Sequence, residues 1–91
     1  MPQLVVPGSW HNVTSGRVRS DLPAGNLCEL LEAFVEEHPE AGYRLYSAGG
    51  ELLRYHIFFV DGEQVYRTTP PDEVALEPGS TVEIVPPLSG G

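Results

Sequence analysis

One segment of the chain has the apolar spacing of a helix, and it stands between segments with the pattern of strands. From Asn26 to His38, apolar side chains recur every three or four residues, which places them along one stripe of an α-helix. The stripe consists of Leu27, Leu30, Leu31, Phe34 and Val35. Asn26 with Glu29 three residues later is typical of a capping box, and Pro39 predicts the end of the helix. Because no second helix has this pattern, the stripe must be buried against a sheet.

Short β-forming runs lie on both sides of this helix. They predict the strands Gln3–Pro7, Arg17–Leu22, Leu52–Val60, Gln64–Tyr66 and Thr81–Val85. Asp61-Gly62 directly follows the third strand and is a strong signal for a two-residue hairpin turn. The other segments are predicted as connections: Gly8–Gly16 as a loop that contains Trp10, Glu40–Gly50 with one short turn at Tyr43–Tyr46, and Thr68–Pro78 as a crossing anchored by Val74 and Leu76.

The order of these elements is ββαβββ, so one main helix must cover one face of a mixed sheet of four to five strands. The last strand fits best beside the first strand and parallel to it, which is the β-grasp (ubiquitin-like) arrangement of the α+β class. We expect one domain at residues 1–85, followed by an extended tail at residues 86–91. The core is predicted to contain Leu30, Leu31, Phe34, Phe58, Val60, Val82 and Ile84.

The other face of this sheet has no second helix to cover it. Alternation along the strands turns the predicted core residues inward and leaves their neighbours outward. The outward apolar residues are Ile57, Phe59 and Val85, with Leu88 just beyond the final strand. An apolar patch of this kind predicts a docking surface for a partner protein. The alternative is that the loop around Trp10 folds over the patch and buries it within the monomer.

The charge of the chain limits the partners that such a surface can bind. There are 13 acidic and 5 basic residues, which give a formal charge of −8. The phosphates of a nucleic acid would be repelled by this surface, whereas a basic protein would be attracted to it. No apolar run reaches the ~20 residues of a membrane span, and Met1-Pro2-Gln3 does not begin a signal peptide. We therefore expect a cytoplasmic protein that binds neither nucleic acid nor a membrane.

Side chains that could support catalysis or bind a metal are present but scattered. His11, His38 and His56 lack the spacing of a metal site, and His38 falls at the end of the predicted helix, which favours a structural role. The sequence has no glycine-rich phosphate-binding loop, so we do not expect the chain itself to bind ATP. The single cysteine, Cys28, excludes an internal disulfide, and the charge of Glu29 opposes thiolate formation. The sequence thus predicts no catalytic residue, no metal and no bound cofactor.

The chain ends in Pro86-Pro87-Leu88-Ser89-Gly90-Gly91. Two consecutive prolines hold the backbone extended and stiff. Glycine has no Cβ, so a Gly-Gly end can enter a narrow slot and leaves the terminal carboxylate unhindered. This end predicts a carboxylate on which another enzyme acts, whereas the plain alternative is a frayed terminus.

The stretch Leu76–Gly91 resembles the end of the ThiS/MoaD family of ubiquitin-like sulfur carriers. In that family the last strand follows a Gly-Asp turn and leads into an apolar-Pro-Pro-apolar-x-Gly-Gly end, and here Ser80 stands in place of the Asp. Phe58–Glu63 also resembles the strand-Asn-Gly-Glu hairpin of the family, with Asp61 in place of the Asn. Gly25-Asn26-Leu27 is similar to the Gly-x-Thr-Leu type opening of the family's helix.

The resemblance implies a mechanism in which the chain is a carrier and not an enzyme. A partner of the ubiquitin-activating type would adenylate the Gly91 carboxylate with ATP and Mg²⁺, and a sulfur donor would displace AMP to leave a thiocarboxylate. A sulfur-accepting enzyme would then use the sulfur in the synthesis of thiamine, molybdopterin, cysteine or a secondary metabolite. Within the family, the chain looks most like the carriers of cysteine synthesis. Three features carry this likeness: the loop around Trp10, the insertion at Ser47–Leu53 and the Leu-Ser-Gly-Gly end.

Two other interpretations remain. A ubiquitin-like protein modifier has the same features, because an activated Gly91 could equally be joined to lysines of other proteins. A β-grasp interaction module with a tail of no function is the third possibility.

Overall fold

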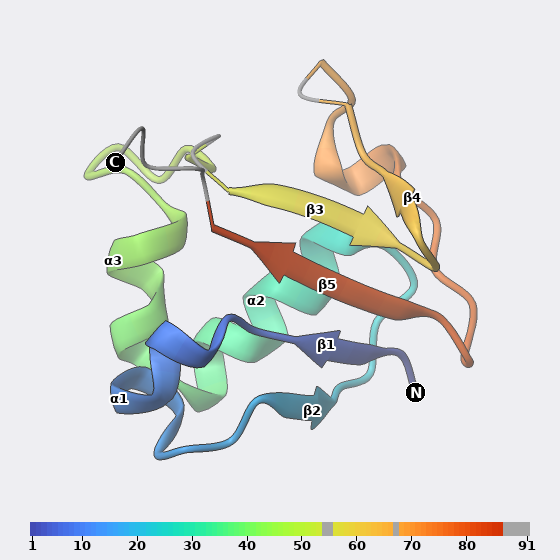
Figure 1. Ribbon diagram of the computed structural model, residues 1–91. Helices are drawn as coiled ribbons and strands as arrows, with labels where there is room; N and C mark the ends of the chain where they lie inside the picture. The colour runs from blue at the N-terminus through green and yellow to red at the C-terminus, as the bar shows by residue number, and fades with distance from the viewer. Residues whose placement is uncertain (54–55, 67, 87–91) are drawn as a thin grey trace.

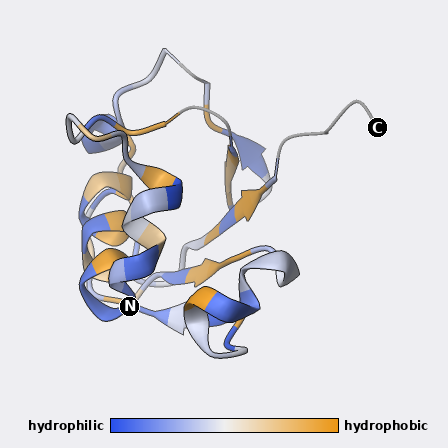
Figure 2. Cartoon of the chain, turned by 90° about the vertical axis from the view of Figure 1, so that its left-hand side faces the viewer, coloured by the Kyte–Doolittle hydropathy of each residue, from blue (hydrophilic) through white to orange (hydrophobic). Residues whose placement is uncertain are grey.

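The computed structural model describes residues 1–53, 56–66 and 68–86, which form one mixed sheet with the longest helix packed against one face of it (Figures 1 and 2). The strands are β1 (Gln3–Val5), β2 (Arg19–Asp21), β3 (Ile57–Val60), β4 (Glu63–Gln64) and β5 (Thr81–Val85). Their order in the sheet is β2-β1-β5-β3-β4. β5 therefore lies in the centre, parallel to β1 and antiparallel to β3, and this confirms the predicted β-grasp arrangement.

The main helix, α2 (Leu27–Glu37), has the predicted bounds within one residue at each end. Asn26 caps it, because its side-chain Oδ1 accepts a hydrogen bond of 2.8 Å from the backbone N–H of Glu29. The Glu29 carboxylate in turn accepts a bond of 2.7 Å from the N–H of Gly25, one residue earlier than in a standard capping box. The backbone N–H of His38 donates the last helical hydrogen bond, to the carbonyl of Phe34, and Pro39 then ends the helix.

The core lies between α2 and the sheet. Leu27, Leu30, Leu31 and Phe34 of the helix are fully buried. They face the inward side chains of the strands, which the register aligns in the pairs Leu4–Val82 and Phe58–Ile84. Val60 is the one predicted core residue that is only partly buried. It is the last residue of β3 and lines a hollow together with Val74 and residues of the hairpin.

The segment predicted as a loop around Trp10 is in fact helical. It forms a 3-10 helix, η1 (Gly8–Trp10), followed by one turn of α-helix, α1 (His11–Thr14). The left-handed backbone of Ser15 and Gly16 then ends this turn. The sequence did not predict this helix, because a single turn among glycine and polar residues has no apolar repeat. The turn is stabilised here by the burial of Trp10.

The third strand begins five residues later than predicted, at Ile57 and not at Leu52. After the 3-10 helix η2 (Pro39–Ala41) and α3 (Gly42–Leu45), a tight turn at Ser47–Glu51 reverses the chain. Leu52 consequently bridges Tyr46, and the N–H of Leu53 donates to the carbonyl of Leu45. These hydrogen bonds to the end of α3 keep Leu52 and Leu53 out of the sheet. The predicted short turn at Tyr43–Tyr46 is confirmed by α3.

The hairpin between β3 and β4 has the predicted two-residue turn. Asp61 and Gly62 both have positive φ, 51° and 87°, as a type I′ turn requires. The return strand starts directly at Glu63, so β4 lies earlier than the predicted Gln64–Tyr66. The crossing that follows contains the 3-10 helix η3 (Pro71–Glu73), and Leu76 is buried beside Gly25, to whose carbonyl it donates its N–H.

Candidate functional site

The outer face of the sheet, which points away from α2, carries the predicted apolar residues. In the β3–β5 pairing, Ile57 lies opposite Val85 and Phe59 lies opposite Glu83. Their neighbours Phe58 and Ile84 are 3% and 2% exposed and point into the core, so these four alternate to the other side. Ile57, Phe59 and Val85 are partly exposed, as the sequence predicted.

One further residue of this face was not included in the predicted surface. Val5 of β1 is the parallel partner of Glu83 and is also partly exposed. Its outward direction follows from alternation in β1, but its place beside β5 follows only from the register between distant strands. We call Val5, Ile57, Phe59 and Val85 together the outer patch.

Trp10 does not cover the outer patch. Its side chain is 1% exposed and stacks on Phe34 of α2, with 6.4 Å between the ring centroids. His56 meets its ring edge-on at 5.2 Å, and the Arg44 guanidinium lies 5.8 Å from its centroid. Phe34 belongs to α2, which packs on the inner face of the sheet, so Trp10 is part of the core. The alternative in which the Trp10 loop buries the outer patch is therefore wrong.

The chain leaves the sheet at the border of the outer patch. β5 ends at Val85, opposite the first residue of β3, and the exposed Pro86 follows (Figure 1). The rest of the predicted tail lies outside the described residues, namely Pro87, Leu88, Ser89, Gly90 and Gly91. The roles of these residues, including that of Leu88 in partner binding, stay predictions.

Cys28 has the surroundings of an unreactive thiol. Burial and then the charges of Glu32, Asp72 and Glu29 raise the pKa of the Cys28 thiol, and the Glu32 carboxylate lies 3.8 Å from its sulfur. A raised pKa leaves little thiolate at neutral pH, and the thiolate is the nucleophilic form. The effect of Glu29 on the Cys28 pKa has the direction that the sequence predicted.

The three histidines lie in separate surroundings. His11 is exposed, and its Nδ1 lies 3.2 Å from the carbonyl oxygen of Gly8. His38 packs on Phe34 at 5.1 Å between ring centroids, whereas His56 packs on Trp10. Burial, followed by the nearby Arg44, lowers the pKa of His56. Within residues 1–53, 56–66 and 68–86, no group of three His, Cys, Asp or Glu side chains could hold a metal ion.

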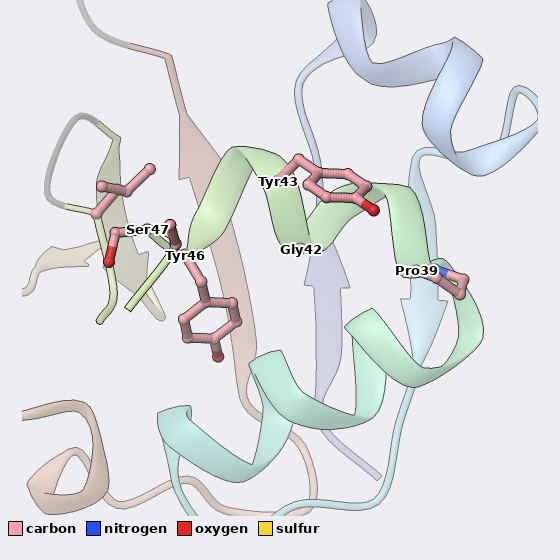
Figure 3. A pocket seen from close by; sticks show the side chains of 7 residues that line it. Pro39, Gly42, Tyr43, Tyr46 and Ser47 are labelled. Atoms are coloured by element: carbon pink, nitrogen blue, oxygen red, sulfur yellow. The ribbon is translucent and has the colours of Figure 1, made fainter. Parts of the chain in front are cut away.

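A hollow with a volume of about 690 Å³ lies beside α3 (Figure 3). It is lined by Pro39, Gly42, Tyr43, Tyr46, Ser47, Ala48 and Leu53. Burial is the main cause that raises the pKa of Tyr46 to about 12, so its phenol stays protonated at neutral pH. The lining thus offers hydroxyl groups without a carboxylate or an imidazole to act as a general base.

No helix in the described ranges is both long enough and apolar enough to cross a membrane. In the described part of the chain, the outer patch presents partly exposed apolar side chains next to the end of the C-terminal strand.

Several solved structures share this fold. CysO of Amycolatopsis orientalis, in a complex with BexX, has a TM-score of 0.84 and 22% identity, and the match covers 100% of both chains. CysO of Mycobacterium tuberculosis has a TM-score of 0.82 and 20% identity, with 97% of this chain and 100% of the other covered. SAMP1 of Haloferax volcanii, a small archaeal modifier protein, has a TM-score of 0.77 and 25% identity, with 99% and 98% covered.

No curated protein gives a significant match over its sequence. The model of the ThiS family, in contrast, matches residues 6–91, which include the outer patch from Ile57 onward and the Gly-Gly end. The fold, the pairing of β5 with β1 and this match lead to one assignment. The chain belongs to the ThiS family of ubiquitin-like sulfur carrier proteins.

Proposed function

We propose that this protein carries sulfur as a thiocarboxylate on Gly91 and that a ubiquitin-activating-type enzyme charges it. In the first step a Gly91 carboxylate oxygen attacks the α-phosphorus of ATP, and pyrophosphate leaves with Mg²⁺. The product is an acyl-adenylate, a mixed anhydride. In the second step a sulfide-equivalent nucleophile attacks the carbonyl carbon and AMP leaves. The carboxylate oxygen that became bonded to phosphorus departs with AMP, and sulfur takes its place on the carbonyl carbon.

The observation that carries this proposal is the match to the ThiS family over residues 6–91. It extends through the final strand to Gly90-Gly91, the one place in the chain whose chemistry fits activation by another enzyme. The chain itself is proposed to supply no catalytic residue, because positioning and charge stabilisation come from the partner. The raised pKa values of Cys28 and Tyr46 support this proposal, because they favour the protonated thiol and the protonated phenol, which are poor nucleophiles and poor bases.

The outer patch is proposed as the surface that docks first on the adenylating enzyme and later on the sulfur-accepting enzyme. Ile57, Phe59 and Val85 lie next to the point where the chain leaves the sheet, so a partner bound there would hold the tail near its own active site. Leu88 is proposed to extend the contact along the tail. Because adenylation uses ATP, we place the reaction in the cytoplasm.

We propose cysteine synthesis as the pathway that receives the sulfur, with thiamine, molybdopterin or secondary-metabolite synthesis as alternatives. The support is a fold match that covers 100% of this chain and of A. orientalis CysO. A match over both whole chains includes the helical segment around Trp10 and the turn after Ser47, two features that resemble the carriers of cysteine synthesis. The complex with BexX in that structure supports the idea that such carriers dock on partner enzymes.

The likeness to SAMP1 supports a second candidate function. SAMP1 is named as a modifier protein, and it shares 25% identity and 98% of its length with this chain. The same acyl-adenylate could be attacked by the amine of a lysine in a target protein, and this would join Gly91 to the target through an isopeptide bond. Both functions begin with the same activation of Gly91.

Mass spectrometry of the protein isolated from its own cells distinguishes the two functions. For a carrier, we expect an intact form that is heavier by the difference between a sulfur and an oxygen atom. A thiol-selective alkylating agent should add one group more to this form than to the form with a free carboxylate, in which Cys28 is the single thiol. For a modifier, digestion should release branched peptides in which Gly91 is joined to a lysine. If only the free carboxylate is found in cells that are depleted of cysteine, the carrier function is refuted.

A further inference from the structure

Glu83 stands in the middle of the outer patch. It belongs to the central strand β5, with Val5 of β1 on one side and Phe59 of β3 on the other. Adjacent strands in a sheet lie about 5 Å apart, so these neighbours border Glu83 closely. Val85 lies two residues further along the same face. A single carboxylate is therefore placed within an apolar surface.

Among the residues that the structure describes, no basic side chain pairs with this carboxylate. Glu83 is exposed and forms no ion pair with any residue of the described ranges. Arg19, in the same cross-strand row, is two strands away at the edge of the sheet, beyond Val5. Its guanidinium donates instead to the side-chain oxygen of Gln3 at 2.9 Å. Arg54 and Arg67 lie outside the described residues.

Strand stability does not account for a glutamate at this position. Glutamate is disfavoured in strands, and a β-branched or aromatic residue would pack better between Val5 and Phe59. If the outer patch docks on a partner, Glu83 becomes buried near the centre of the interface. A charge buried there without a partner costs binding free energy, whereas a charge that meets an opposite charge contributes to specificity and to the association rate.

We propose that Glu83 is a specificity determinant of docking, paired in the complex by a lysine or arginine of the adenylating enzyme. This rests on the proposed function. The partner surface would have a basic side chain surrounded by apolar residues, which is complementary to Glu83 within the outer patch. A net charge of −8 steers the carrier toward basic surfaces in general, and Glu83 selects the one that also fits the patch.

The test uses the full chain and the purified ubiquitin-activating-type enzyme of the same organism, with ATP–pyrophosphate exchange measured against carrier concentration. Glu83→Gln keeps the shape of the side chain and removes its charge. Glu36→Gln on the exposed side of α2 removes the same charge from the opposite side of the molecule and is the matched control. We expect Glu83→Gln to raise the half-saturating concentration at least about tenfold and Glu36→Gln to change it less than about twofold.

The expected salt dependence gives a second measurement. The half-saturating concentration of the wild-type chain should rise with ionic strength more steeply than that of Glu83→Gln, because the variant lacks the attraction that salt screens. Equal effects of Glu83→Gln and Glu36→Gln, or tighter binding by Glu83→Gln, would overturn the inference. Thermal melting of each variant checks that folding is unchanged.

Phe59→Ser separates failure of this inference from failure of the proposed function. If Phe59→Ser weakens docking and Glu83→Gln does not, the patch docks but Glu83 does not select the partner. If neither variant has an effect, the docking face itself is wrong. If the wild-type chain supports no ATP–pyrophosphate exchange at all, the proposed function fails and this inference fails with it.

Discussion

Asp61 and Thr81 are joined by two hydrogen bonds, each 2.9 Å long. The N–H of Asp61 donates to the carbonyl of Thr81, and the N–H of Thr81 donates to the Asp61 carboxylate. These bonds connect the hairpin turn to the first residue of the central strand β5. They fix the start of the strand that later carries Glu83 and Val85 to the outer patch.

We expect Asp61→Ala to reduce the free energy of unfolding by about 1–3 kcal/mol. Alanine lacks the acceptor for Thr81 and is strained at φ 51°, a left-handed conformation that Asp and Asn tolerate better. Asp61→Asn keeps both properties and should cost less than about 1 kcal/mol. Chemical denaturation measures both values. Equal losses for the two variants would show that neither the acceptor nor the backbone conformation matters.

The burial of α2 is tested by Leu31→Ala. Leu31 is fully buried against the sheet, so its truncation leaves a cavity and should cost roughly 2–5 kcal/mol. Such a loss is a large share of the stability of a small domain. Glu32→Ala, at the next and exposed position of the helix, is the control and should have a small effect. A melting temperature for Leu31→Ala close to that of the wild type would contradict the packing of this helix face.

The pH dependence of stability should contain a contribution from His56. Its folded pKa lies below the ordinary histidine value of about 6.5, mainly because of burial and secondly because of Arg44. The unfolded chain therefore binds a proton first as the pH falls, so this contribution is present above about pH 6.5 and is lost as the pH decreases toward the folded pKa.

His56→Gln removes this contribution. Between about pH 7 and pH 5, the free energy of unfolding of the wild type should fall more steeply than that of the variant. Denaturation curves at a series of pH values measure the slopes, and parallel curves for wild type and His56→Gln would refute the assignment.

The outer patch is tested by Phe59→Ser. Phe59 is partly exposed on the face away from α2, so we expect the melting temperature to change little. Removal of the aromatic ring should weaken docking on the adenylating enzyme by roughly tenfold or more, because buried aromatic residues dominate many interfaces. Surface plasmon resonance measures the affinity. If Phe59→Ser lowers the stability of the protein but its folded fraction binds with wild-type affinity, the docking surface lies elsewhere.

The Gly-Gly end is tested by Gly91→Ala and by deletion of Gly91. Folding should be unaffected, because a terminal residue contributes little to a core. Activation should fall sharply, since an added Cβ clashes in a slot shaped for glycine. ATP–pyrophosphate exchange reports activation, with Ser89→Ala as the control just before the diglycine. Normal exchange with either Gly91 variant would show that the terminus is not the substrate.

Elements that depend on interactions between neighbouring residues could be predicted from the sequence. The apolar stripe of α2, the cap at Asn26 and the turn at Asp61-Gly62 were all predicted, because helical spacing, capping and positive φ are local properties. Alternation within β3 and β5 also identified Ile57, Phe59 and Val85 as outward residues. A strand has only two faces, so one buried neighbour decides the direction of the next.

Contacts between residues that are distant in the sequence could not be predicted in this way. The pairing of Val5 with Glu83 depends on the register between β1 and β5, which no local pattern specifies. The position of Trp10 on Phe34 likewise depends on packing, and that packing turned the expected loop into a helical segment. β3 begins at Ile57 because the end of α3 binds the residues that local β-propensity had favoured for the strand. Long-range hydrogen bonds and burial outweigh such weak local preferences wherever the two compete.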